Sequence, residues 1–297
     1  MQNRRDFLKN ASLLLAGGMV APHLVTSCGG KTTAAASTKT IGLQLYSLRE
    51  MVADEGIQKV LETVAEIGYK NLETASYNDG KVYGLPPSEF KKIVTDLGMK
   101  CTSAHLGTSY TKETEATAMA WWDKAIETHA ELGVKYLVQP SMPVAISTNT
   151  TLDDLKLSCD YFTAVGYKTA AASIAFGFHN HDSEFKTIDD SVIFDYLLEN
   201  VSRNHVFFEL DVYWCIRGGG DPVAYLRERP SQFKTIHIKD EKEIGASGMI
   251  DFQPIFEQMK ANNVKDWYVE VEEYTNNDPV ASVRESFDYL NRAEYVY

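Results

Sequence analysis

Short apolar runs rich in β-branched and aromatic residues alternate with longer segments of helical periodicity along most of the chain. In the longer segments apolar residues recur every three or four positions, as at Val60, Val64 and Ile67. The short runs predict eight strands, over residues 41–46, 71–75, 100–105, 135–139, 174–179, 206–212, 235–239 and 267–272. The periodic segments predict eight helices, over residues 57–67, 88–97, 114–132, 152–172, 191–200, 222–228, 252–261 and 279–292.

Regular alternation of strands and helices is typical of parallel sheets in α/β proteins. Glycines follow three of the predicted helices, at Gly68, Gly98 and Gly133, where a left-handed residue commonly ends a helix. A doubly wound open sheet is the competing architecture, but no glycine-rich phosphate loop follows the first predicted strand. Eight strand–helix units over residues 40–297 match the roughly 250 residues of a (β/α)8 barrel. We therefore expect a single catalytic domain with the TIM barrel fold.

The first residues are typical of an export signal and are set apart from the barrel. Arg4 and Arg5 resemble a twin-arginine motif, and the apolar stretch that follows is short for a membrane span, which needs about 20 residues. It ends in Val-Thr-Ser-Cys, which resembles a lipobox. We expect a signal over residues 1–28 with lipidation at Cys28, a flexible tether over residues 29–39, and a periplasmic or membrane-anchored lipoprotein.

The composition of the chain limits the classes of binding partner that we expect. The net charge of −12 provides no electrostatic footprint for nucleic acid. We therefore expect a small-molecule carbohydrate partner, no nucleic acid, and membrane contact through the lipid anchor only; self-association into a homo-oligomer stays open. Cys101, Cys159 and Cys215 show no recognisable spacing, so free thiols are expected.

Metal-competent side chains occur at the ends of the last four predicted strands. Strand residues two apart share a face, and the pairs are His179 with His181, Glu209 with Asp211, His237 with Lys239, and Glu270 with Glu272. In a closed parallel barrel the C-terminal strand ends converge on one pocket. A buried network in which these groups satisfy one another is the alternative interpretation.

A mixed set of imidazoles and carboxylates suits transition metals better than Mg or Ca, which prefer oxygen ligands. Such an ion polarises a carbonyl or enediolate oxygen and eases removal of an adjacent proton. A nearby carboxylate or imidazole then moves that proton. We therefore expect one divalent metal ion, with Mn, Zn or Co favoured.

Four motifs, IGLQLYSLR, FGFHNHDSEF, ELDVYW with GGGDPVAYL, and IHIKD, resemble the sugar phosphate isomerase/epimerase group of the xylose-isomerase-like barrels, the AP endonuclease family 2 type. The resemblance runs from about residue 40 to the C-terminus. It implies a metal site at the ends of strands five to eight, formed by His179, Asp211, His237 and Glu270. His181 is the alternative to His179 as a ligand.

The resemblance also indicates a departure from the usual chemistry. Ketose 3-epimerases of this superfamily carry glutamate on the fifth strand as well as on the eighth, and both glutamates act as ligands and as acid/base catalysts. This chain has His179 at the fifth-strand position. That difference favours chemistry with a single base, such as dehydration or β-elimination next to a ketone.

Further candidates follow from their positions near strand ends. We expect catalytic roles for Glu270, His181 and His105. Substrate contacts are expected from Tyr46, Glu73, His105, Trp214 and Lys239. Each has an alternative as a core or hydrogen-bonded residue, and for Lys239 the alternative is an ion pair with one of the two acidic residues that follow it. His129 is expected at the surface or at a helix cap.

These residues predict a divalent-metal-dependent carbohydrate isomerase or epimerase that removes a proton alpha to a sugar carbonyl. One alternative is a metal-dependent lyase or hydratase that acts on 3-keto glycosides or dehydrates a keto-polyol. The other is a lipoprotein that binds carbohydrate without turning it over.

Overall fold

The computed structural model describes residues 39–297. The expected signal, with its lipidation site at Cys28, and all of the expected tether except its last residue lie outside the described residues. Within residues 39–297, no helix combines the length and the apolar character that crossing a membrane requires.

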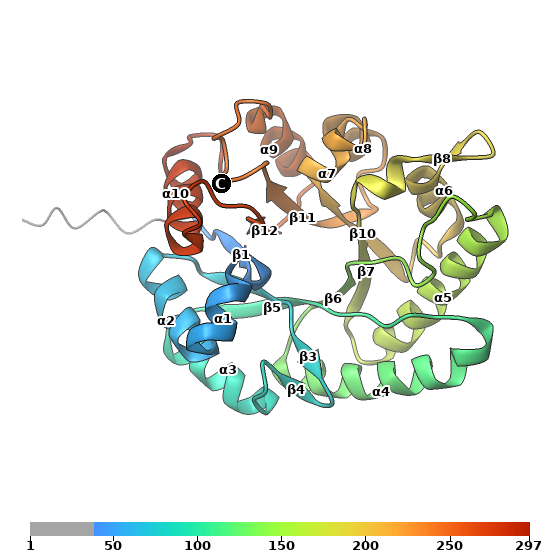
Figure 1. Ribbon diagram of the computed structural model, residues 1–297, viewed down its shortest axis with the longest axis horizontal. Helices are drawn as coiled ribbons and strands as arrows, with labels where there is room; N and C mark the ends of the chain where they lie inside the picture. The colour runs from blue at the N-terminus through green and yellow to red at the C-terminus, as the bar shows by residue number, and fades with distance from the viewer. Residues whose placement is uncertain (1–38) are drawn as a thin grey trace, which may run out of the picture. The chain divides into compact units, whose positions relative to one another are not determined.

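Eight parallel strands close into a barrel, and helices surround it (Figure 1). Around the barrel the strands are β1 (Gly42–Gln44), β2 (Asn71–Thr74), β5 (Lys100–His105), β6 (Tyr136–Gln139), β7 (Ala175–His179), β10 (Val206–Asp211), β11 (Phe233–Lys239) and β12 (Asp266–Glu270). β12 pairs with β1 and completes the ring. The (β/α)8 barrel predicted from the alternation of strands and helices is therefore confirmed.

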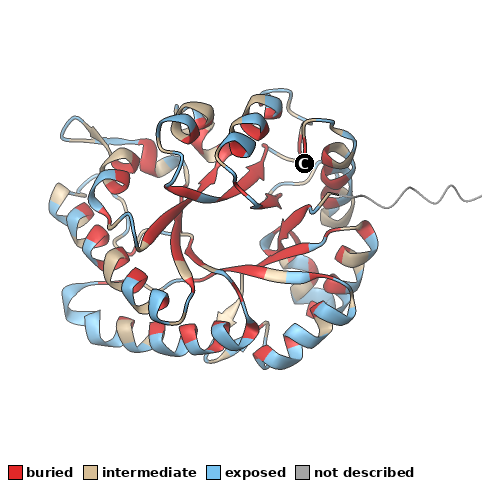
Figure 2. Ribbon diagram, turned by 180° about the vertical axis from the view of Figure 1, so that it is seen from behind, coloured by how far each residue is buried: buried red, intermediate tan, exposed pale blue. Residues whose placement is uncertain are grey.

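The helices lie outside the strands and bury their inner faces against them (Figure 2). They are α1 (Arg49–Glu55), α2 (Ile57–Ile67), α3 (Pro87–Asp96), α4 (Glu115–Leu132), α5 (Leu152–Ala171), α6 (Ile193–Asn200), α7 (Val212–Arg217), α8 (Pro222–Glu228), α9 (Phe252–Ala261) and α10 (Pro279–Arg292). Gly68, Gly98 and Gly133, which follow α2, α3 and α4, have φ angles of 122°, 71° and 87°, as their predicted role requires. Cys101, Cys159 and Cys215 are free.

Four predicted strands, β1, β2, β10 and β12, end one or two residues earlier than expected, and at β1 and β10 the reason is a side chain that starts a helix at the strand end. The Gln44 side chain accepts a hydrogen bond from the backbone N–H of Tyr46, and the chain enters the 3₁₀ helix η1 (Leu45–Leu48). The Asp211 carboxylate caps α7 in the same way, accepting from the N–H of Trp214 at 2.8 Å. Tyr46 therefore lies in a helical turn above the barrel.

Short elements complete the rim of the barrel. They are the hairpin of β3 (Tyr77–Asn78) with β4 (Lys81–Val82), the hairpin of β8 (Thr187–Ile188) with β9 (Ser191–Val192), and the 3₁₀ helices η2 (Lys112–Thr114) and η3 (Asp182–Phe185). The periodicity of the sequence predicted none of them, and the first two residues of the helix expected over residues 191–200 form β9 instead.

Candidate metal and substrate site

The C-terminal ends of β7, β10, β11 and β12 bring together the four ligands implied by the motifs, His179, Asp211, His237 and Glu270. One donor atom from each residue lies within 4.8 Å of the others, and all four residues are buried. The contact between His237 Nδ1 and Glu270 Oε2 measures 3.2 Å. His181 lies just beyond the end of β7, outside this four-donor group.

The four donors fit a divalent cation on chemical grounds. Asp211 Oδ2 is buried and has no hydrogen-bond partner among the described residues. Burial raises the pKa of Asp211 to about 8, against the opposing charge of Lys239, so the carboxylate needs more positive charge than the protein supplies. Two imidazoles and two carboxylates form the mixed nitrogen and oxygen set that transition metals prefer.

Two fully buried carboxylates lie behind the donors and orient the imidazoles. Glu209 Oε2 is 2.5 Å from His105 Nε2 and 3.1 Å from His237 Nε2, while Glu73 Oε2 is 2.6 Å from His237 Nε2. A histidine that binds a metal usually donates its other ring N–H to a carboxylate. Because Nε2 of His237 faces these two carboxylates, its Nδ1 faces the four-donor group. Glu73 is held in turn by Gln44 and Ser103.

The pKa values of the histidines of the site are shifted in different directions. Burial alone would lower the pKa of His237 and of His105, but the surrounding carboxylates outweigh burial and raise the pKa of both. Around His181 burial prevails over the attraction of Glu270 and lowers the pKa. His181 is therefore neutral near pH 7 and can accept a proton.

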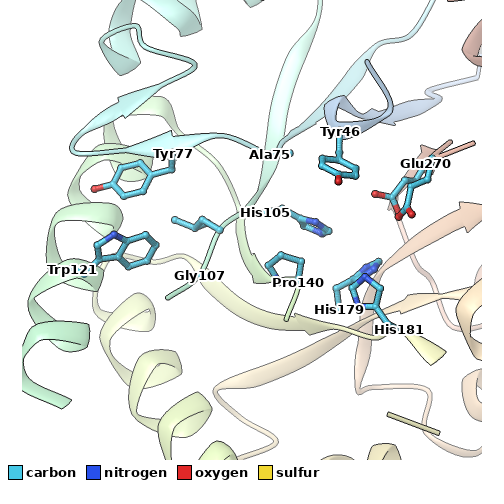
Figure 3. Close-up of a pocket in the computed structure, with 12 residues that line it drawn as sticks. Tyr46, Ala75, Tyr77, His105, Gly107, Trp121, Pro140, His179, His181 and Glu270 are labelled. Atoms are coloured by element: carbon cyan, nitrogen blue, oxygen red, sulfur yellow. The ribbon is translucent and has the colours of Figure 1, made fainter. Parts of the chain in front are cut away.

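A cavity of about 450 Å³ opens beside the four donors (Figure 3). Of the predicted site residues, it is lined by Tyr46, His105, His179, His181 and Glu270, and Glu272 also lines it. The expected catalytic residues Glu270, His181 and His105 thus line one pocket together with His179, and two of the four donors, His179 and Glu270, lie in that lining.

Three predicted substrate contacts lie outside this lining. Glu73 is completely buried behind His237. The Lys239 ammonium is 3.2 Å from Glu272 and 3.8 Å from Glu270, and it lies 5.6 Å from the centre of the Trp214 ring. Lys239 therefore pairs with carboxylates of the neighbouring strand, and not with the two acidic residues that follow it.

Sequence reasoning was wrong about His129, and it named Glu209 only as one of the metal-competent side chains, without a role in holding the histidines. His129 is completely buried in α4, where Nδ1 lies 2.7 Å from the carbonyl oxygen of Ala125, so it is neither a surface nor a capping residue. Glu209 contacts three imidazoles, although the motifs imply only Asp211 as the ligand from that strand. The alternation that places Glu209 and Asp211 on one face was the available signal.

The fold and the site define a xylose-isomerase-like barrel with a four-donor cluster at its C-terminal mouth. Residues 61–293 match the family model of the xylose isomerase-like TIM barrel, and the chain belongs to that family.

Solved and curated relatives agree with this assignment. A sugar phosphate isomerase/epimerase from Parabacteroides distasonis is 37% identical, with 87% of this chain and 100% of that chain covered and a TM-score of 0.82. An inosose dehydratase from Clostridium beijerinckii is 22% identical over 288 residues, which cover 85% of this chain and 92% of the relative. A 3-dehydro-D-guloside 4-epimerase from Escherichia coli is 23% identical over 254 residues, which cover 80% of this chain and 94% of the relative.

Proposed function

We propose that the protein is a divalent-metal-dependent enzyme of carbohydrate chemistry, of the isomerase or epimerase type, which removes a proton alpha to a sugar carbonyl. One observation carries the proposal: Glu270 and His179 belong both to the four-donor group and to the lining of the 450 Å³ pocket. A bound cation and a bound sugar would therefore lie next to each other. The epimerase and dehydratase among the relatives support an enzyme that acts on sugars.

The residues divide into holding and proton-moving groups. His179, Asp211, His237 and Glu270 would hold the ion, whose charge would stabilise negative charge on the oxygen beside the reacting carbon. Glu270 also lines the pocket and would act as an acid/base group as well as a ligand. His181 lines the pocket outside the donor group, so its imidazole is placed to accept or return the proton. His105 is held by Glu209 and lines the pocket, where it is placed to contact a substrate oxygen.

A lyase or hydratase acting on 3-keto glycosides is the second candidate, and the placement of carboxylates favours it. Among the described residues, the carboxylates that line the pocket are Glu270 and Glu272, both at the end of β12. Glu184, which follows β7, accepts a hydrogen bond from the backbone N–H of His181 instead of entering the pocket. Ketose 3-epimerases carry the second carboxylate of their catalytic pair at the end of the fifth strand. In this chain imidazoles occupy that position.

Proton exchange in D2O separates the candidates. Purified protein is loaded with Mn, Zn or Co and incubated with keto-sugars and 3-keto glycosides, and the products are followed by NMR. Deuterium at the alpha carbon with altered stereochemistry or carbonyl position supports isomerisation. Loss of an aglycone or of water supports elimination. Binding of sugar without exchange from any substrate supports the non-catalytic lipoprotein and refutes the enzyme.

We also propose that the protein is exported and lipidated at Cys28. Arg4 and Arg5, the apolar stretch and the small residues before Cys28 support this. Cys28→Ser is expected to release the protein from the membrane fraction and to prevent incorporation of labelled fatty acid. Continued labelling of the Cys28→Ser protein would show that the lipidation site is elsewhere.

A further inference from the structure

The end of the pocket away from the metal donors is aromatic. Tyr77, on β3, and Trp121, on α4, line that end with their ring centroids 5.3 Å apart and their planes at 84°. Figure 3 shows both rings across the pocket from Glu270 and His179. Both side chains are only half-buried. Large aromatic rings left accessible in a cleft are typical of ligand-binding surfaces.

The wall between the two ends is apolar and carries no positive charge. It contains Ala75, Leu106, Gly107 and Pro140, and none of the described residues that line the pocket is Lys or Arg. The nearby cations are engaged: Lys239 contacts Glu272, and Arg49 donates to the hydroxyl of Tyr274 and the carbonyl oxygen of Glu272 at 3.0 and 2.9 Å. At the aromatic end, the charge of Lys124 acts on Tyr77, and Lys124 is paired with Asp79. A phosphate group bound there would therefore meet no basic side chain among the described residues that line the pocket.

The size of the pocket leaves room beyond one sugar ring. A volume of about 450 Å³ falls in the range of about 300–1,000 Å³ that drug-sized ligands occupy. Figure 3 shows His105 and His181 at the donor end with Glu270. Glu272, which shares the ammonium of Lys239 with Glu270, lies at the same end, so the polar groups that could orient hydroxyls gather there. A reacting sugar held there leaves the aromatic end for a second group attached to it.

We propose that Trp121 and Tyr77 form a subsite for an uncharged, ring-shaped aglycone of a keto-glycoside. The inference rests on the proposed function, because the reacting keto-sugar must occupy the donor end. The glycosidic oxygen leads from that sugar along the apolar wall, and a ring with an apolar face packs against the indole of Trp121. An aryl group and a second sugar both offer such a face. A sugar 1-phosphate, with a dianion at the same place, is disfavoured.

The test compares four 3-keto-glucose derivatives that differ only at the anomeric substituent: the methyl, phenyl and glucosyl glycosides and the 1-phosphate. For the natural sequence, we expect kcat/KM at least about tenfold higher for the phenyl or the glucosyl glycoside than for the 1-phosphate. Trp121→Leu is expected to raise KM for that preferred glycoside, relative to the methyl glycoside, by about tenfold, the factor for one lost aromatic contact. Which glycoside is preferred identifies the aglycone as aryl or sugar.

Two further variants make the comparison specific. Tyr77→Ala is expected to act in the same direction as Trp121→Leu, and Tyr167→Ala, which removes a tyrosine 57% exposed on α5, serves as the matched control. If Trp121→Leu is unstable, Trp121→Phe and Tyr77→Ala carry the test. A preference for the 1-phosphate, or equal changes for methyl and ring-bearing glycosides, overturns the proposal.

Binding without turnover separates this subsite from the proposed reaction. Phenyl and glucosyl glucosides that lack the ketone are titrated while tryptophan fluorescence and saturation-transfer NMR are recorded. The expected result is contact of the aglycone ring with the protein. The affinity for the glucoside is expected to be about tenfold lower in Trp121→Leu. If this contact is seen but no keto-substrate exchanges protons, the proposed function fails and the subsite stands. If keto-sugars react but the aglycone makes no contact, the subsite fails alone.

Discussion

Two clusters of polar side chains lie at opposite ends of the same barrel. We call the first the mouth cluster, at the C-terminal strand ends, made of Glu73, His105, His179, Glu209, Asp211, His237 and Glu270. We call the second the floor cluster, toward the N-terminal strand ends, made of Asn71, Thr102, Lys135, Tyr136, Asp266 and Tyr268. All residues of the mouth cluster are buried, whereas in the floor cluster Lys135 is exposed and Tyr136 half-buried. The two clusters also differ in how completely their polar atoms are satisfied.

The floor cluster is complete within the protein. Asp266 Oδ2 accepts hydrogen bonds from Lys135 Nζ at 2.9 Å and from the Tyr136 hydroxyl at 3.1 Å, and Oδ1 is 3.4 Å from the Asn71 amide nitrogen. Thr102 joins Asn71 to the Tyr268 hydroxyl, each at 2.7 Å. Every polar side chain here has a partner, as buried polar groups normally do.

The mouth cluster is incomplete within the protein. Asp211 Oδ2 and Glu209 Oε1 are buried without a hydrogen-bond partner, and His179 Nδ1 lies 3.3 Å from Glu209 without a well-aligned hydrogen bond. In barrels of this kind, activity belongs to the C-terminal face and stability to the N-terminal face. The comparison teaches that unsatisfied polar atoms together with a pocket, more than burial alone, distinguish the functional end.

The largest effect is expected at the mouth. Glu270→Gln keeps the size of the side chain but removes its charge from the donor group and from the pocket. We expect turnover of the best keto-sugar to fall roughly 10²–10⁴-fold, the range for loss of an acid/base group. The measurements are deuterium exchange and bound metal by mass spectrometry. Glu273→Gln, on the exposed loop that follows, is the control, and equal losses in both variants would contradict the assignment.

A smaller effect is expected behind the donors. Glu209→Gln leaves all four donors in place but replaces the carboxylate that contacts His105, His179 and His237. Metal affinity is expected to fall about 10–100-fold, as for other groups that orient metal-bound histidines. Titration with Zn or Mn in a competing chelator measures it. The exposed Glu241→Gln is the control, and unchanged affinity in Glu209→Gln would show that Glu209 does not orient the ligands.

Hydrophobic periodicity predicted the barrel well because the eight barrel strands are buried on both faces over most of their length and the α-helices around them are buried on one face. It failed at Tyr46 and Val212, which were expected in strands and lie in helical turns. Those turns depend on the side chains of Gln44 and Asp211 bending back to the backbone. Periodicity reports only which face is buried, so it has no access to such local hydrogen bonds.

The site was predicted in part for a related reason. Strand alternation and the family motifs selected four residues whose donor atoms the structure brings together, because side chains at parallel strand ends must converge. Alternation does not give depth along the barrel axis, so it could not place Glu209 and Glu73 behind the donors. Tyr77 and Trp121 were missed because they come from a hairpin and a helix outside the strand pattern.

The floor cluster is expected to influence stability alone. Asp266→Asn removes the charge that pairs with Lys135 and leaves the Tyr136 hydroxyl without its carboxylate acceptor. We expect the free energy of unfolding to fall by about 1–3 kcal/mol, because a buried charged acceptor is lost. Denaturant unfolding measures this. Asp160→Asn, in an exposed pair with Lys156, should cost about 0.5 kcal/mol or less. If each folded Asp266→Asn molecule also lost activity, the floor cluster would not act on stability alone.

The smallest effect tests whether an unsatisfied atom by itself marks a functional site. His129 Nε2 is also buried without a partner, but the residue lies in α4, where it packs 5.2 Å from the Tyr77 ring, and it belongs to neither cluster. Burial lowers the pKa of His129 to about 4.

Folded protein therefore keeps His129 neutral where the unfolded chain, with an ordinary pKa near 6.5, binds a proton. Acid then favours unfolding progressively from pH 6.5 down to about pH 4. Between pH 7 and pH 5.5 this group is expected to remove about 1 kcal/mol of stability. Denaturant unfolding at both pH values should show that His129→Gln lacks this part of the decline while its metal affinity stays that of the natural sequence. A change in metal affinity would mean that an orphaned nitrogen outside the mouth is coupled to the site, and the distinction between the clusters would have to rest on the pocket alone.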